Sequence, residues 1–268
     1  MMRRSALALL LGMAAFAPSA PASAEMTEAA RQTRWNELRH AIFGEHAVKD
    51  GADLVRIEAP ERAQDAAIVP VTISLAAPLQ KRVRNLYFVI DDNPSPLAAV
   101  FHFGSAADPQ AVATRVRIDD YTYMHAVAEL ADGALYASAR FIKAAGGCSA
   151  PATADASAAM ARLGKMKASF QQAEGALTTQ LLISHPNSSG LQMDPVSRNY
   201  IPADFIQQIR VSYAGEPVLT VDSDIALSED PSVRFAFLPR KPGDLRVEVD
   251  DSNQRHFVQS WPIAVATQ

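Results

Sequence analysis

The chain has almost no cysteine, because Cys148 is the single thiol among its 268 residues. A lone cysteine has no partner for an internal disulfide, so a fold held together by disulfide bridges is excluded. The six histidines also occur without a second histidine, cysteine or carboxylate at the spacing of metal ligands. Each is interpreted as a surface or structural residue, and we predict no metal or other cofactor for this chain.

Motifs of common enzymes are missing as well. The sequence has no Gly-x-Ser-x-Gly elbow and no phosphate-binding glycine loop. A thiol peptidase needs a histidine beside its cysteine, and the thiol often begins a helix. Here Gly146 and Gly147 precede the thiol, and Ser-Ala-Pro at 149–151 follows it. We therefore predict that the chain is not an enzyme.

Runs of basic residues are absent, and the formal net charge is -4. Proteins that bind nucleic acid usually carry a basic stripe or patch. The composition therefore argues against a nucleic-acid partner.

Long apolar runs are absent too, and the most apolar segment lies near the N-terminus. Arg3 and Arg4 precede a short apolar run, 7–16, and Ala-Ser-Ala at 22–24 follows. This layout is typical of a secretory signal peptide, and the run is too short to span a bilayer. We predict a signal peptide at 1–24 with cleavage after Ala24, export to a periplasm, and no membrane insertion.

The first half of the remaining chain predicts one helix followed by strands. Trp35, Leu38, Ile42 and Phe43 recur at helical spacing, which predicts a helix over 26–43 ending before Gly44. Partly alternating, β-branched segments separated by Asn-, Asp-, Pro- and Gly-rich turns then predict strands. These segments are 53–60, 66–75, 85–96, 112–119, 123–130 and 133–143.

A second series of strands follows a different segment. Residues 149–168 begin rich in Ala, Ser and Pro and are interpreted as an interdomain linker with a short helix. Strands are then predicted at 176–186, 204–224 (a hairpin), 232–239, 244–251 and 256–265. The fold class is therefore all-β, with two immunoglobulin-like sandwiches. The predicted domains are 25–148 and 169–268.

Cys148 follows the last strand of the first half through Ala-Ala-Gly-Gly. Two glycines free the backbone, and small neighbours leave the thiol unobstructed. An extended chain covers about 3.3 Å per residue, so these five residues could project the sulfur roughly 15 Å. We therefore predict that Gly146 and Gly147 form a flexible arm and that Cys148 stands exposed at its tip, as a carrier of covalent cargo.

Several segments resemble a known family. Ile-Glu-Ala-Pro at 57–60, Asp-Asn-Pro-Ser-Pro at 92–96, Thr-Arg-Val-Arg at 114–117 and Gly-Gly-Cys at 146–148 are similar to SoxY. Phe-Gly at 43–44 and Val-Pro-Val at 69–71 continue that pattern. The second half is similar to SoxZ, in Ile-Ser-His-Pro at 183–186, Gly-Leu at 190–191, Ile-Pro-Ala-Asp-Phe-Ile at 201–206 and Phe-Ala-Phe at 235–237. The chain thus resembles a fusion of the two subunits of the SoxYZ sulfur carrier of periplasmic thiosulfate oxidation.

The resemblance is greatest to single-chain SoxYZ-like carriers associated with quinoprotein dehydrogenases. It implies immunoglobulin-like sandwiches in both halves and Cys148 as the attachment site of sulfur intermediates. It also implies partners among quinoprotein dehydrogenases, cytochromes or sulfur-oxidising enzymes, and a SoxZ half without chemistry of its own. This chain departs from separate SoxY subunits because it continues beyond the cysteine, so the arm is tethered at both ends.

Two alternatives remain open at this stage. The protein could be a docking or assembly module for a quinoprotein dehydrogenase system, with an inert cysteine. It could also be an enzyme that acts through the thiol. An adduct on Cys148 would support the carrier. A Cys148→Ser strain with unchanged growth and oxidation would support the docking module, and turnover by the purified chain alone would support the enzyme.

Overall fold

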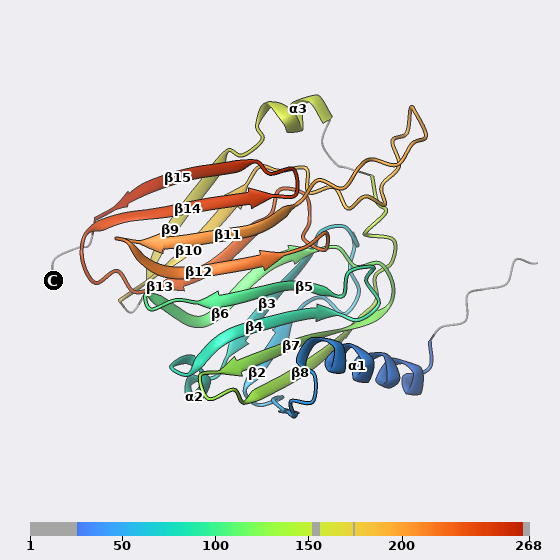
Figure 1. Ribbon diagram of the computed structural model, residues 1–268, viewed down its shortest axis with the longest axis horizontal. Coiled ribbons are helices and arrows are strands. Elements are labelled where there is room, and N and C mark those ends of the chain that lie inside the picture. The colour runs from blue at the N-terminus through green and yellow to red at the C-terminus, as the bar shows by residue number, and fades with distance from the viewer. Residues whose placement is uncertain (1–25, 152–155, 174, 265–268) are drawn as a thin grey trace, which may run out of the picture.

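The computed structural model describes residues 26–151, 156–173 and 175–264 (Figure 1). The predicted signal peptide lies outside the described residues. The helices of the described part are α1 (Glu28–Phe43), α2 (Ala77–Gln80) and α3 (Ala156–Ala161). The strands of the first half are β1 (Val48–Asp50), β2 (Val55–Glu58), β3 (Val69–Leu75), β4 (Val83–Ile90), β5 (Leu97–Phe103), β6 (Ala107–Val116), β7 (Thr122–Leu130) and β8 (Leu135–Ile142). Those of the second half are β9 (Met166–Ala173), β10 (Ala176–Ile183), β11 (Ile206–Tyr213), β12 (Glu216–Ser223), β13 (Ser232–Phe237), β14 (Gly243–Asp251) and β15 (His256–Ile263).

These strands form two sheets that pack face to face (Figure 1). One sheet has nine strands in the order β1-β8-β7-β4-β5-β12-β11-β14-β15, and the other has six in the order β2-β3-β6-β13-β10-β9. Pairing is antiparallel throughout the named strands except between β1 and β8. The prediction of an all-β protein of immunoglobulin-like sandwiches with an N-terminal helix is confirmed.

Both sheets run through both halves of the chain. β5 pairs with β12, where Phe101 lies opposite Val221, and β6 pairs with β13, where Arg234 lies opposite Ala113. One apolar cluster includes buried residues from both halves, among them Phe88 and Phe237. The two halves therefore share a continuous core, and the line along which β5 meets β12 and β6 meets β13 is called the seam below.

The alternating pattern correctly predicts which side chains face the core. Leu245, Val247 and Val249 of β14 are all buried, as the period of two requires. In the hairpin of β11 and β12, Ala214 and Gly215 both have positive φ, the conformation of a tight two-residue turn. Full burial of each such aliphatic side chain contributes about 1.5–3 kcal/mol, so the sandwich is stabilised chiefly by these facing rows.

The helix α1 covers the outer face of the nine-stranded sheet beside β7 and β8 (Figure 1). Thr27 accepts a hydrogen bond from the backbone of Ala30 at the start of the helix, and Gly44 ends it with φ 61°. Trp35 stacks on His125 of β7 with ring centroids 3.7 Å apart. The helix predicted over 26–43 is thus confirmed, and it packs against the sheet rather than projecting away.

The predicted linker, 149–168, is partly regular structure. It contains α3, and β9 begins at Met166 within it. The residues at 152–155 lie outside the described residues. Both sheets cross the seam, so the predicted domains 25–148 and 169–268 are two segments of the sequence that share the same pair of sheets.

Candidate functional site: the cysteine arm at the seam

The segment that follows β8 lies along the end of β6 rather than in solvent. The backbone N–H of Gly146 donates to the carbonyl oxygen of Asp119 at 2.8 Å, and that of Gly147 donates to Ile118 at 2.9 Å. Cys148 then lies in a turn, with its side chain fully buried. Residues 144–151 are called the arm below, and this arrangement is its closed state.

The two glycines of the arm meet different structural requirements. Gly146 has φ 77°, which side-chain-bearing residues rarely adopt, and a Cβ built there would have nothing within 4 Å. A Cβ at Gly147 would instead lie 2.0 Å from the carbonyl oxygen of Ala66 and 2.7 Å from that of Ile118. Gly147 is therefore a close-approach glycine, and the closed arm depends on its lack of a side chain.

The charged neighbours of the thiol come from the same stretch of chain, just beyond β6. The side chain of Asp119 and the buried guanidinium of Arg117 both lie near enough to the Cys148 thiol to act on it electrostatically. Burial, reinforced by the Asp119 charge and opposed by Arg117, raises the pKa of the thiol from its ordinary 9.0 to about 12. Because the thiolate is the nucleophile, the closed thiol is protonated and unreactive near neutrality.

A buried asparagine holds these charged residues in place. The Asn93 side chain donates to the carbonyl oxygen of Arg117 at 2.8 Å and accepts from the backbone N–H of Asp119 at 2.9 Å. Arg117 itself donates through Nη1 to the carbonyl oxygen of Leu227 in the second half, while its buried Nε has no hydrogen-bond partner among the described residues. The Asp-Asn-Pro turn seen in the sequence thus positions the charges around the thiol.

The second half of the chain holds the arm from the other side of the seam. The hydroxyl of Ser189 donates to the carbonyl oxygen of Cys148 at 2.5 Å, and Nε2 of Gln192 donates to the carbonyl oxygen of Ala150 at 2.8 Å. The backbone N–H of Ser189 donates in turn to Oε1 of Gln192 at 3.2 Å. The arm is therefore bound on one side by segment 118–119 and on the other by the connection between β10 and β11.

The prediction of an exposed thiol on a projecting stalk is wrong for this closed state. Cys148 has no exposed surface, and the arm makes backbone hydrogen bonds with its neighbours. The small residues that suggested freedom permit close packing instead, because Gly147 lets two backbones approach within contact distance. A neutral thiol also behaves as a small hydrophobe, so its burial is favourable. Whether Gly146 and Gly147 also serve as hinges stays a prediction.

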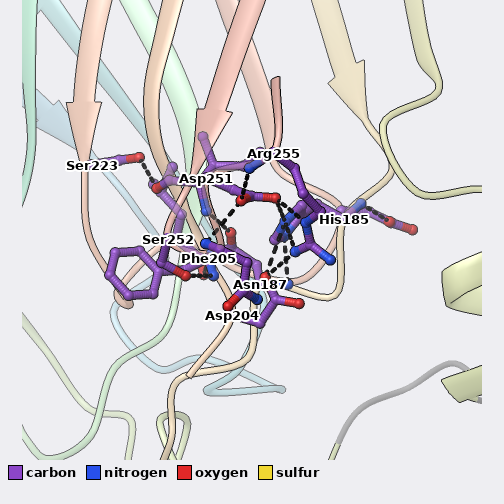
Figure 2. A network of polar contacts seen from close by, with 12 residues as sticks. His185, Asn187, Asp204, Phe205, Ser223, Asp251, Ser252 and Arg255 are labelled. Carbon is purple, nitrogen blue, oxygen red and sulfur yellow. Dashed lines mark hydrogen bonds and ion pairs between the residues drawn. The ribbon is translucent and has the colours of Figure 1, made fainter. Parts of the chain in front are cut away.

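A second polar cluster lies at the base of the connection between β10 and β11 (Figure 2). His185, just after β10, is within 3.5 Å of Asp204 and 3.3 Å of Asp251, and Arg255 contacts both carboxylates. The backbone N–H of Asn187 donates to Nδ1 of His185 at 3.0 Å, which fixes the neutral tautomer with its proton on Nε2. Burial is the largest cause that lowers the pKa of His185.

The donor set of this cluster is also one that metal ions accept. Arg255, however, already supplies a cation to both carboxylates, and the imidazole nitrogen that faces them carries a proton. We therefore assign the cluster as an ion-pair network that fixes the two ends of the connection.

Local sequence indicated the cysteine but missed the residues that cover it. Arg117 and Asp119 lie about thirty residues before the thiol, and Ser189 and Gln192 lie about forty after it. The Thr-Arg-Val-Arg segment offered one signal, because Arg117 lies between the apolar residues Val116 and Ile118 and charged side chains are seldom fully buried. The sequence of the second half does not indicate that Ser189 contacts the arm, because this contact depends on how the strands of the two halves pair.

Both halves of the chain match known protein families. Residues 39–148 match the family described as sulfur oxidation protein SoxY, and residues 165–262 match sulphur oxidation protein SoxZ. The chain belongs to the SoxYZ-like family, with both domains fused in one polypeptide. The SoxY match ends at Cys148, so residues 144–148 of the arm are the last segment of the SoxY domain, and Ser189 and Gln192 belong to the SoxZ domain.

Parts of the chain are also similar to solved structures. The sulfur carrier protein SoxY from Chlorobium limicola f thiosulfatophilum is 26% identical over 44% of this chain and 96% of its own, with a TM-score of 0.37. A superoxide reductase (neelaredoxin) from Ignicoccus hospitalis is 20% identical over 34% of this chain and 79% of its own, with a TM-score of 0.28. No curated protein matches the chain. The two family matches support a sulfur carrier role.

Within 26–151, 156–173 and 175–264, no helix has the length and apolar character that a membrane span requires.

Proposed function

We propose that this protein is an exported, periplasmic carrier that holds a sulfur-containing intermediate covalently on Cys148 and presents it to partner enzymes. The supporting observation is the place of the chain's single cysteine: it ends the SoxY match and lies on a segment held closed largely by hydrogen bonds. Such contacts contribute about 0.5–1.5 kcal/mol each, so the arm can open without unfolding the sandwich. The chain itself performs no turnover.

Loading requires a redox partner. Coupling the Cys148 thiol to the sulfhydryl of a cargo forms one S–S bond and releases two protons and two electrons. A redox enzyme must accept those electrons, and the proposed partners are a quinoprotein dehydrogenase, a cytochrome or a sulfur-oxidising enzyme. The closed state keeps the empty thiol protonated, and the open state restores the ordinary thiol pKa of 9.0.

The test is intact-mass analysis of protein purified from its native source. We expect a mass increase that maps to Cys148 and disappears on reduction with dithiothreitol, and the lone cysteine makes the assignment unambiguous. A Cys148→Ser strain should lose oxidation of the reduced sulfur substrate. Unmodified protein under all growth conditions, with a Cys148→Ser strain that oxidises normally, would instead identify a docking module with an inert cysteine.

A further inference from the structure

The connection between β10 and β11 projects from the sandwich as a hairpin of its own. Figure 1 shows it standing clear of both sheets at the upper right, in gold to orange. Isolated bridges pair Ser188 with Asp204 and Met193 with Tyr200, so the chain runs outward and returns beside itself. Residues 187–204 are called the projecting hairpin below.

This hairpin is ordered by its own hydrogen bonds. At its tip, Oδ1 of Asp194 accepts from the backbone N–H groups of Val196 and Ser197, at 3.0 Å and 2.6 Å. Nearer the base, the N–H of Ile201 donates to the carbonyl oxygen of Gln192 at 2.8 Å. The base itself is fixed by the His185 ion-pair network (Figure 2). The hairpin is therefore a defined shape rather than a loose loop.

Its outward side chains are unusually apolar. Among the described residues, four of the seven exposed large hydrophobic side chains lie within it: Leu191 (38% exposed), Met193 (42%), Val196 (90%) and Tyr200 (66%). The charged residues of its outer part, 191–200, are Asp194 and Arg198, one of each sign. A concentrated, nearly neutral apolar surface on an ordered projection is typical of a protein-binding site.

The same hairpin holds the cysteine arm. Gln192 lies between the exposed Leu191 and Met193 and donates to the arm at Ala150. Ser189, two residues before Leu191, donates to the arm at Cys148, and its Oγ accepts from the backbone N–H of Leu191 at 3.2 Å. A protein that contacts these apolar side chains therefore contacts the neighbours of the two residues that keep the thiol closed.

We propose that the projecting hairpin is the surface by which the enzyme that loads or unloads Cys148 recognises this protein, and that its binding there releases the arm. This inference rests on the carrier function proposed above. The enzyme is assigned as the occupant because Ser189 and Gln192 of the hairpin contact the arm directly, so a protein bound to the hairpin lies beside the thiol that it must reach. A second copy of the chain bound there would cover the route to the thiol instead.

The release half is tested on the purified protein with N-ethylmaleimide as the probe. Removing both arm contacts in Ser189→Ala/Gln192→Ala should raise the alkylation rate of Cys148 about tenfold, since each bond contributes a few-fold to ten-fold to the closed population. Ser197→Ala is the matched control, because its hydroxyl contacts only the backbone of Asn199. Equal rates in all three proteins would overturn the claim that the hairpin holds the arm.

The recognition half is tested by adduct occupancy in native cells. Val196→Asp and Tyr200→Ser change exposed side chains and leave the arm contacts intact, so their N-ethylmaleimide rates should equal the wild-type rate. We expect their adduct occupancy, measured by intact mass, to fall at least about fivefold. Val258→Asp, on β15 and 42% exposed, is the control and should keep wild-type occupancy.

The outcomes separate this inference from the carrier function. An adduct on the wild-type protein with undiminished occupancy in Val196→Asp would overturn the hairpin as recognition surface and leave the carrier function standing. No adduct on the wild-type protein would overturn the carrier function and, with it, the assigned partner. A wild-type dimer that Val196→Asp converts to monomer, measured by light scattering, would show that a second copy is the occupant and overturn the proposal.

Discussion

The hydroxyl of Ser189 in the SoxZ domain donates a hydrogen bond to the carbonyl oxygen of Cys148 in the SoxY domain. The two residues belong to different halves and meet where both sheets cross the seam. The SoxZ domain therefore does more than support the SoxY domain, because it supplies part of the cover over the thiol. Four predictions follow from the contacts around this pair.

Gly147→Ala should open the arm. Its Cβ would lie 2.0 Å from the carbonyl oxygen of Ala66, a backbone atom that cannot yield as a flexible side chain does. We expect alkylation of Cys148 by iodoacetamide to become at least about tenfold faster, because loss of the closed packing removes more than one contact worth about 1 kcal/mol.

Two other glycines serve as controls for that experiment. Gly146→Ala introduces left-handed backbone strain of about 1–2 kcal/mol without a clash, so its effect on alkylation should be smaller. Gly133 also has positive φ, 81°, and open space around it, in the turn between β7 and β8. If Cys148 is alkylated as fast in Gly133→Ala as in Gly147→Ala, then general destabilisation, and not opening of the arm, determines the alkylation rate.

The stability of the closed state should fall at alkaline pH. Burial and the Asp119 charge raise the pKa of the Cys148 thiol to about 12 against the opposing effect of Arg117, whereas the thiol of an unfolded chain titrates near 9. The folded protein thus binds this proton more tightly, so its contribution is complete below pH 9 and is lost between pH 9 and 12. We expect the Tm of the wild type to fall faster from pH 8 to 10.5 than that of Cys148→Ser, and parallel curves would contradict this.

Removing the charge of Asp119 and removing that of Arg117 should change the reactivity of the Cys148 thiol in opposite directions. Asp119→Asn removes an adjacent negative charge, so the pKa of Cys148 should fall and its alkylation at pH 8 should become several-fold faster. Arg117→Gln removes the charge that stabilises the thiolate, so alkylation should become slower.

The measurement for this pair is the pH profile of the alkylation rate, which one cysteine makes simple to interpret. Arg117→Lys retains the positive charge and should restore the wild-type profile if electrostatics, rather than packing, is responsible. A shift in the same direction for Asp119→Asn and Arg117→Gln would show that both merely loosen the arm.

Mild acid should weaken the base of the projecting hairpin. Burial lowers the pKa of His185 below 6.5, although Asp204 and Asp251 oppose that effect and Arg255 reinforces it. The unfolded chain therefore takes up a proton that the folded chain resists, so stability is complete above pH 6.5 and declines below it. The pKa of Asp251 is lowered too, but its contribution is lost only as pH falls below about 4.

His185→Gln tests this prediction directly. The variant should lose about 1–3 kcal/mol at pH 7.5, because it breaks a buried hydrogen-bonded network. Its free energy of unfolding should then vary less between pH 7.5 and 5 than that of the wild type. His40→Ala is the control, since that imidazole is exposed and the wild-type pH profile should survive the change.

The sequence predicts the sandwich well because apolar and polar residues alternate along strands that have one buried face and one exposed face. The strand β5 was missed for the opposite reason: its apolar run, Leu97–Phe103, is largely buried on both faces and does not alternate. That strand pairs with β12 and joins the two halves, so without it the chain looked like two separate sandwiches. The short β1 and the strand β9, which begins in the predicted linker, carried too little pattern to be found.

The environment of Cys148 was beyond local sequence reasoning for a related reason. Small residues such as Ala145, Gly146 and Gly147 are compatible with an exposed loop and equally with a close-packed one. The choice between them depends on Ala66 and Ser189, which are distant in sequence and reach the thiol only through strand pairing. A sequence pattern can identify a reactive residue, whereas the residues that bury it are brought together only by the fold.

The chain continues past Cys148 through Pro151 toward α3, so the thiol lies on a bend of the backbone and not at a free end. An enzyme that acts on it must therefore admit two strands of polypeptide at once, one arriving at the sulfur and one leaving it. Neighbouring extended strands lie about 4.8 Å apart, so a cleft open along one side meets this requirement, and a narrow tunnel shaped for a single strand does not.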